Sequence, residues 1–106
     1  MTYARINIDQ AKTLILDENA QVIDIRDPAS YRSGAIEGAQ HIDNSNVQDF
    51  LAEADKSRPL IVCCYHGNMS QGAANFFHQQ GFERSYSLDG GYTAWALQVG
   101  PGILAT

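Results

Sequence analysis

The chain lacks the long apolar run and the run of basic residues that would connect it with a membrane or a nucleic acid. Its longest apolar stretch is Leu60–Tyr65, far short of the roughly 20 residues of a membrane-spanning helix. Acidic side chains outnumber basic ones by 12 to 7, which gives a formal net charge of −5. We therefore expect neither a nucleic-acid nor a membrane partner. The first residues, MTYARINIDQ, also lack the pattern of a signal peptide, which predicts a cytoplasmic protein.

Cysteine is scarce as well: the chain has two, Cys63 and Cys64, and they are neighbours. Adjacent cysteines rarely form a disulfide with each other, so a disulfide framework is not expected. The histidines are scattered along the chain without a spacing typical of zinc ligands. We accordingly predict no metal ion and no other cofactor. A free thiol is left as the candidate for reactive chemistry.

The length of 106 residues fits one domain spanning residues 1–106. Apolar patterns and turn residues predict short strands that alternate with helices. The expected strands are Ala4–Ile8, Gln21–Ile25, Gln40–Ile42, Leu60–Cys63 and Arg84–Leu88. The expected helices are Gln10–Glu18, one from Pro28 that ends before Gly34, one that ends near Ala54, Ser70–Gln80, and one after Gly91 that leads into a loose end over 100–106. This alternation predicts an α/β fold with a mostly parallel, five-stranded sheet and helices on both of its faces.

Residues that accept hydrogen bonds from the first N–H groups of a helix predict where the helices begin. The candidates are Asp9 for the first helix, Asp27 for the second, Asn44 or Ser45 for the third and Ser70 for the fourth.

The segments that follow the expected strands should meet at one edge of the sheet, because the carboxyl ends of parallel strands lie together there. These segments are Arg26-Asp27, Cys64–Ser70 and Asp89–Gly91. The second one begins with a thiol at the end of a buried strand and finishes at the start of a helix. We therefore expect a ligand site at this edge.

The turn after the buried strand reads Cys64, Tyr65, His66, Gly67, Asn68, Met69 and Ser70. Gly67 and Asn68 tolerate positive φ, so the turn can curl its N–H groups toward one point beside the helix start. Such a group of donors binds anions and lowers the pKa of a thiol. A second interpretation stays open on the residues alone: Cys63 and Cys64 could be small buried side chains at a strand end.

Four motifs, in this order, resemble those of the rhodanese family over nearly the whole chain. They are Val22–Asp27, Ser33–Ala39, Val62–Ser70 and Leu88–Trp95, and the third is most similar to small single-domain bacterial members. The resemblance implies a thiosulfate sulfurtransferase in which Cys64 takes up the outer sulfur of thiosulfate as a persulfide. The sulfur would then pass to cyanide in an assay, or to a thiol acceptor such as thioredoxin in the cell. The resemblance also implies that residues 65–70 bind the substrate and the persulfide.

The sequence departs from the family pattern in two respects. No Arg or Lys lies between Cys64 and Ser70, so a dianionic donor would bind mainly to backbone dipoles, and weakly. Ala35 stands where the family motif usually has histidine. Among the remaining residues, Ser70 is interpreted as a helix cap rather than as a catalytic hydroxyl. Asp24 and Arg26 are expected to form a structural ion pair near the site.

Two other classes of function stay open. A cysteine phosphatase or an arsenate reductase also uses a thiolate in an anion-binding loop, but it needs an arginine where this turn has Ser70. A non-catalytic rhodanese-like binding module is the other class, although such domains usually lack the cysteine that this chain retains.

Overall fold

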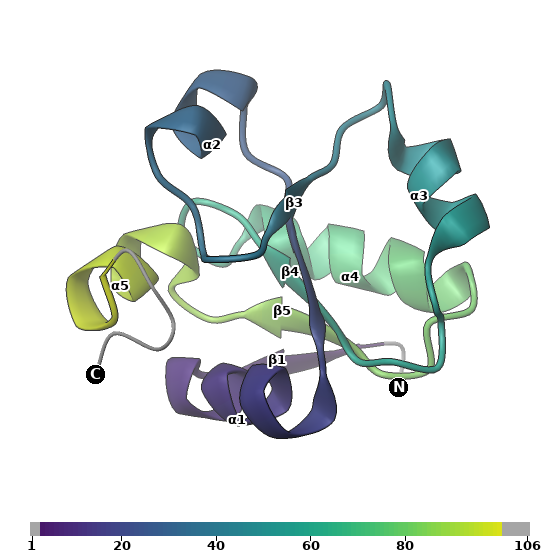
Figure 1. Cartoon of the computed structure of the whole chain (residues 1–106), viewed down its shortest axis with the longest axis horizontal. Coiled ribbons are helices and arrows are strands. Elements are labelled where there is room, and N and C mark those ends of the chain that lie inside the picture. Colours follow the sequence, from purple (N-terminus) through teal and green to yellow (C-terminus); the bar gives the residue numbers. More distant parts are fainter. Residues whose placement is uncertain (1–2, 101–106) are drawn as a thin grey trace.

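Strands and helices alternate along the whole of residues 3–100, the part of the chain that the computed structural model describes (Figure 1). The strands are β1 (Ala4–Ile6), β2 (Gln21–Asp24), β3 (Gln40–His41), β4 (Leu60–Cys63) and β5 (Ser85–Leu88). The helices are α1 (Ile8–Glu18), α2 (Pro28–Ser33), α3 (Val47–Glu53), α4 (Met69–Gln79) and α5 (Gly91–Gln98). The loose end that the sequence predicts lies, beyond Gly100, outside the described residues.

The strands within residues 3–100 form one parallel sheet in the order β1-β5-β4-β2-β3. Strand β4 lies at the centre, and all of its residues are buried, which explains its continuous apolar run. Its side chains alternate between two cores. Ile61 and Cys63 face the core that α1 and α5 cover, whereas Leu60 and Val62 face the core that α3 and α4 cover. The predicted α/β fold, with helices on both faces of a parallel five-stranded sheet, is therefore confirmed.

The predicted starts of α1 and α3 are wrong. Helix α1 is capped by Asn7 rather than Asp9: the Asn7 side chain accepts from Gln10 N at 2.8 Å, and the Gln10 side chain accepts from Asn7 N at 2.9 Å. Helix α3 begins after Asn46 instead of Asn44 or Ser45. The reason is an extra turn before it, in which Asp43 Oδ1 accepts from Ser45 N at 2.8 Å.

The predicted start and end of α2 are confirmed, and they matter for the site. Asp27 Oδ2 accepts from Ser30 N at 3.0 Å, Pro28 occupies the first helical position, and Gly34 follows the last one. This short helix therefore stands directly after β2, at the edge of the sheet where the carboxyl ends of the strands lie. On the left of Figure 1, the turn after β4 reaches the same edge beside the start of α5.

The helices within residues 3–100 are all too short, or too polar, to cross a membrane.

Candidate active site

The turn after β4 wraps its N–H groups around the sulfur of Cys64. Gly67 N and Ser70 N each donate to Cys64 Sγ at 3.2 Å, and Ser70 Oγ lies at 3.2 Å from the same sulfur. We call residues 65–70 the cradle. Its donors converge because Gly67 reverses the chain and α4 begins immediately afterwards, so that the first free N–H groups of the helix point back at β4.

The environment of Cys64 favours its thiolate. The residue is only 1% exposed, and burial alone would raise the pKa of the thiol. Hydrogen bonds from the Ser70 hydroxyl and from the N–H groups of Ser70, Gly67 and His66 act in the opposite direction and outweigh burial. The pKa of Cys64 is therefore lowered from its ordinary value, which increases the thiolate fraction at neutral pH.

The neighbouring thiol is in the opposite situation. Cys63 is fully buried in the core beside α1 and α5, and its Sγ donates to Cys64 O at 3.5 Å. Burial and the nearby Asp24 carboxylate strongly raise the pKa of Cys63. It therefore remains a protonated, apolar side chain, and the two adjacent cysteines differ in their chemistry.

The cradle lies directly against the turn between β5 and α5. Gly67 has φ +90°, and a Cβ there would come within 2.9 Å of Gly90 N. A Cβ at Gly91, where φ is +58°, would come within 2.5 Å of Cys64 O. Tyr92 N donates to Cys64 O at 2.8 Å across the same contact. Glycine is thus required on both sides, because the two backbones touch.

Tyr65 connects the cradle with α2. Its hydroxyl donates to the Asp27 carboxylate and accepts from Asp27 N at 3.2 Å. The Ser30 hydroxyl and Tyr65 together hold the pKa of Asp27 well below its ordinary value. The residue that caps α2 therefore also anchors the side chain at the entrance of the cradle.

Asp24 and Arg26 form a buried ion pair beside this contact. Arg26 is 6% exposed, and its Nη2 lies 2.7 Å from Asp24 Oδ2 and 2.7 Å from Gly34 O. The guanidinium also lies over the ring of Tyr92, 4.3 Å from its centroid. The Nε and Nη2 groups of Arg26 thus donate inside the protein, where they fix the loop between β2 and α2.

Comparison with known proteins identifies the family. A profile of the rhodanese-like domain matches residues 7–98, nearly the whole of the described chain. The chain belongs to the rhodanese family.

Several relatives and solved structures resemble this rhodanese. "Thiosulfate sulfurtransferase GlpE" of Pseudomonas paraeruginosa is 56% identical over 89% of this chain and 84% of the relative. The protein of the same name from Pseudoalteromonas translucida is 45% identical over 90% of both chains. A solution structure of a rhodanese-like domain from Anabaena is 26% identical, covers 92% of this chain and 76% of that chain, and superposes with a TM-score of 0.79.

The prediction that Ser70 caps α4 is wrong. The residue before this rhodanese helix is Asn68, which makes no side-chain capping bond, and Ser70 lies inside the first turn. The Ser70 hydroxyl instead faces Cys64 Sγ on one side and Ser87 Oγ, at 2.7 Å, on the other. Among the other cradle residues, Tyr65 is half-buried and Gly67 is buried, whereas His66, Asn68 and Met69 are exposed.

The contacts that Asp27 and Ser87 make at the site could not be predicted from the sequence. Asp27 was expected as a helix cap in a segment at this edge of the sheet, but its contact with Tyr65 spans 38 positions of the chain. A signal for Ser87 existed: Ser85 and Ser87 alternate along β5 at positions that are buried in a core strand. A buried hydroxyl needs a partner, so this pattern pointed to polar contacts inside the rhodanese fold.

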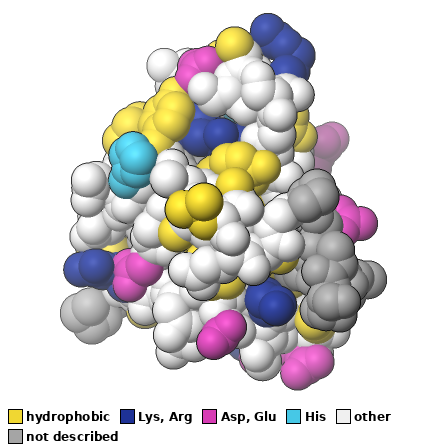
Figure 2. Space-filling model, turned by 90° about the vertical axis from the view of Figure 1, so that its left-hand side faces the viewer, with side chains coloured by type: hydrophobic (Ala, Val, Ile, Leu, Met, Phe, Trp, Pro, Cys, Tyr) yellow, Lys and Arg dark blue, Asp and Glu magenta, His cyan; other side chains and the backbone are white. Residues whose placement is uncertain are grey.

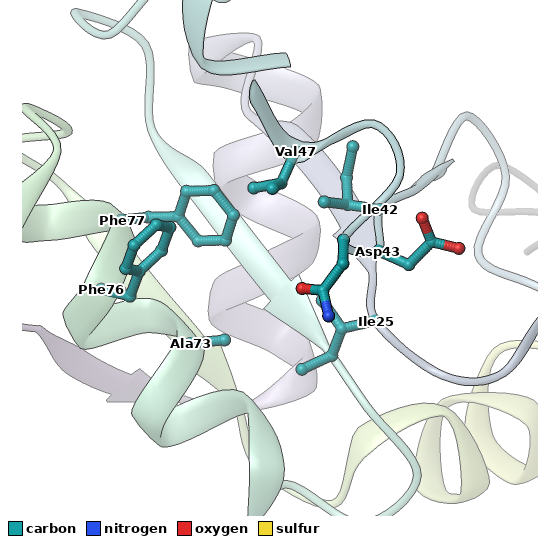
Figure 3. A pocket seen from close by; sticks show the side chains of 8 residues that line it. Ile25, Ile42, Asp43, Val47, Ala73, Phe76 and Phe77 are labelled. Atoms are coloured by element: carbon teal, nitrogen blue, oxygen red, sulfur yellow. The ribbon is translucent and has the colours of Figure 1, made fainter. Parts of the chain in front are cut away.

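The exposed residues of the cradle, His66, Asn68 and Met69, include no Lys or Arg. Figure 2 turns the left-hand side of Figure 1 toward the viewer, and on this face hydrophobic side chains lie near the middle with Lys and Arg side chains among them. Elsewhere, a cavity of about 430 Å³ opens between α3 and α4 (Figure 3). Phe76, Phe77 and Val47 point into it, but Cys64 and the cradle do not line it. It is therefore separate from the thiol.

Proposed function

We propose that this rhodanese is a thiosulfate sulfurtransferase in which the Cys64 thiolate accepts the outer sulfur of thiosulfate. One observation carries the proposal: Cys64 Sγ lies within 3.2 Å of the Gly67 and Ser70 N–H groups and of the Ser70 hydroxyl. These donors stabilise negative charge at the sulfur before, during and after the transfer. The names of the relatives from Pseudomonas and Pseudoalteromonas support the same activity.

In the first step, the Cys64 thiolate attacks the outer sulfur of thiosulfate. A bond forms between Sγ and that sulfur, the bond between the two sulfur atoms of thiosulfate breaks, and sulfite leaves with the electron pair. The product is a persulfide on Cys64. Its terminal sulfur is an anion with no covalent stabilisation, so the inward-facing donors of the cradle are its means of stabilisation.

Burial selects the donor molecule. Cys64 is 1% exposed at the bottom of the cradle, so a sulfur donor must present a small terminal atom to the thiolate. Thiosulfate has such an atom in its outer sulfur, while its charged sulfonate end can stay at the exposed rim. Since the cradle contains no Lys or Arg, the dianion is held by backbone dipoles and we expect weak binding.

In the second step an acceptor removes the sulfur and restores the thiolate. Cyanide attacks the outer persulfide sulfur, thiocyanate forms, and the Cys64 thiolate is the leaving group. A dithiol acceptor such as thioredoxin would take the sulfur as its own persulfide. Its second thiol would then displace hydrosulfide and close a disulfide. A reducing compartment such as the cytoplasm suits this chemistry, because it keeps Cys63 and Cys64 as thiols.

Mass spectrometry of the intact protein tests the proposal. After incubation with thiosulfate and removal of the excess, we expect one added sulfur atom, which cyanide removes. Cys64→Ser should fold but gain no sulfur, because a hydroxyl is a far weaker nucleophile. Cys63→Ala is the matched control, and it should gain one sulfur as the wild type does. A sulfur adduct in Cys64→Ser, or none in the wild type, would refute the assignment.

The same preparations distinguish sulfur transfer from phosphatase chemistry. Hydrolysis of an aryl phosphate needs a guanidinium that grips the phosphoryl oxygens. Ser70 stands at that position of the turn, and the guanidinium of Arg26 is paired with Asp24. We expect no hydrolysis above background, and hydrolysis that disappears in Cys64→Ser would favour the phosphatase instead.

A further inference from the structure

A chain of two buried hydroxyls leads from the sheet to the reactive sulfur. Ser87 lies on β5 and Ser70 in the first turn of α4, and both are 0% exposed. Their Oγ atoms lie 2.7 Å apart, and Ser70 Oγ lies 3.2 Å from Cys64 Sγ. The contact joins two residues that are 17 positions apart in the sequence. Ser87 does not touch the sulfur, so any influence on Cys64 passes through Ser70.

The number of available protons fixes the direction of the hydrogen bonds that connect Ser87, Ser70 and Cys64. A hydroxyl has one proton to donate. When Cys64 is a thiolate it can only accept, so Ser70 donates to Sγ and Ser87 donates to Ser70. When Cys64 is a thiol that donates to Ser70, the Ser70 proton turns toward Ser87. The Ser87 proton then lacks an acceptor, since Ser70 is its hydrogen-bond partner among the described residues. All the donors are satisfied only in the ionised state, which favours the thiolate.

Ser87 also restricts the Ser70 side chain. A serine in the first turns of a helix can rotate its hydroxyl toward a backbone carbonyl four residues earlier. Its bond with Ser87 keeps the Ser70 oxygen between β5 and the sulfur instead. We propose that Ser87 is a positioning residue that holds the Ser70 hydroxyl on Cys64 Sγ and so favours the reactive thiolate. This inference rests on Cys64 as the nucleophile of the proposed function.

Charged groups near the sulfur do not provide an alternative explanation. At the end of β2 and in the loop after it, Asp24 and Arg26 act on Cys63 and pair with each other. After β5, Asp89 pairs with Arg5, and on α5 the ring of Tyr92 lies against Arg26. The pKa of Cys64 depends on burial and on hydrogen bonds from Ser70, Gly67 and His66. The hydroxyl chain is therefore the part of this environment that a side-chain substitution can remove.

The strand offers a matched control in Ser85. It lies two positions before Ser87, is 3% exposed, and donates its hydroxyl to Ala74 O at 2.7 Å. Ser85→Ala and Ser87→Ala thus remove the same atom from the same buried strand. They differ in whether that atom is connected to Cys64.

The test is the pH profile of Cys64 alkylation by iodoacetamide, followed by mass spectrometry, together with kcat/KM for thiosulfate. In Ser87→Ala we expect the midpoint of the profile to move to higher pH and kcat/KM at neutral pH to fall about three- to tenfold. Ser85→Ala should keep the wild-type profile. In a Ser70→Ala background, adding Ser87→Ala should have no further effect, because the connection is already broken.

The outcomes separate the two proposals. A Ser87→Ala profile that matches that of Ser85→Ala would overturn the positioning role. The same holds if Ser87→Ala has its full effect in the Ser70→Ala background. If the alkylation profiles separate as expected while the wild type takes up no sulfur from thiosulfate, the positioning role stands and the proposed function fails. Recovery of the wild-type midpoint in Ser87→Thr, which retains a hydroxyl, would support the positioning role further.

Discussion

Cys63 and Cys64 show how one position in a chain changes the chemistry of a side chain. The last residue of β4 places its thiol in an apolar core, and burial strongly raises the pKa of Cys63. The next residue leaves the strand and meets the donors of the cradle, which lower the pKa of Cys64. Two identical side chains thus have opposite tendencies to ionise at neutral pH.

The lowered pKa of Cys64 predicts the pH dependence of the reaction. Because the proposed nucleophile is the thiolate, kcat/KM for thiosulfate should rise with pH, with a midpoint below that of an ordinary cysteine, and fall on the acid side of this midpoint. The fall should approach about tenfold for each pH unit once the thiol form predominates. Cys64 alkylation should follow the same curve.

Cys63→Ala is the control for this profile. Its midpoint should match that of the wild type, because Cys63 is already protonated throughout this range. If kcat/KM rises with a midpoint at or above that of an ordinary cysteine, the cradle does not stabilise the thiolate.

At the scale of the elements, the cradle depends on close contact between two turns. Gly67 meets the turn between β5 and α5 at a position where φ is +90° and a Cβ would lie 3.0 Å from Leu88 O. Gly72, five positions later on α4, has open space around it. The two glycines therefore predict opposite effects of the same substitution.

Gly67→Ala should destabilise the protein by about 1–3 kcal/mol, through the strained φ and the backbone contact. Gly72→Ala should stabilise it by about 0.5–1 kcal/mol, because alanine is the better residue inside a helix. Urea unfolding measures the free energy of unfolding of both variants. It can be followed by the fluorescence of Trp95, which is buried and is the one tryptophan of the sequence. Equal effects of the two substitutions would contradict the contact between the turns.

The contact between Asp27 and Tyr65 predicts an effect on catalysis from outside the cradle. Asp27→Ala should raise KM and lower kcat/KM severalfold, because Tyr65 loses its anchor on α2. Asp55→Ala is the control and should leave KM unchanged. Asp55 Oδ1 also accepts from a serine N–H, that of Ser57 at 3.0 Å. Asp55 lies before β4, however, and away from the cradle.

The stability difference between Asp27→Ala and the wild type should depend on pH. Since its contacts lower the pKa of Asp27, the carboxylate stabilises the folded state above the ordinary range of a carboxyl group. That contribution is lost as the pH falls through the lowered value. Thermal unfolding at neutral and acid pH measures the difference in Tm between the wild type and Asp27→Ala. We expect this difference to shrink toward acid pH, and a difference that grows would contradict the stabilising role of the carboxylate.

At the scale of the whole molecule, a net charge of −5 disfavours a dianionic substrate. Met69 stands in the cradle and is 57% exposed, whereas Leu16 stands near the end of α1 and is 52% exposed. Met69→Arg should lower KM for thiosulfate about two- to fivefold, as an exposed charge close to an anion does. Leu16→Arg adds the same charge elsewhere and should change KM little. Steady-state kinetics at constant ionic strength measures both, and equal decreases would show that net charge rather than the cradle limits binding.

The sequence by itself determined the order of the elements and the position of the thiol that we propose to be reactive. Apolar periodicity and turn residues are local, so the strands around Val22, Ile61 and Leu88 could be predicted from their own neighbourhoods. Parallel strands then place the ends of β2, β4 and β5 at one edge. This topological rule was sufficient to predict a turn of N–H donors beside Cys64.

Only the tertiary structure decided which side chains reach that turn. The Ser70 hydroxyl could have capped α4, but Ser87, 17 positions away, provides a partner that holds it on the sulfur. Tyr65 could have packed anywhere on the sheet, but Asp27, 38 positions away, binds its hydroxyl. The helix starts at Asn7 and Asn46 likewise depend on which of several nearby polar groups has the better geometry. Hydrogen bonds form where distance and angle allow, and these are known only once the chain has folded.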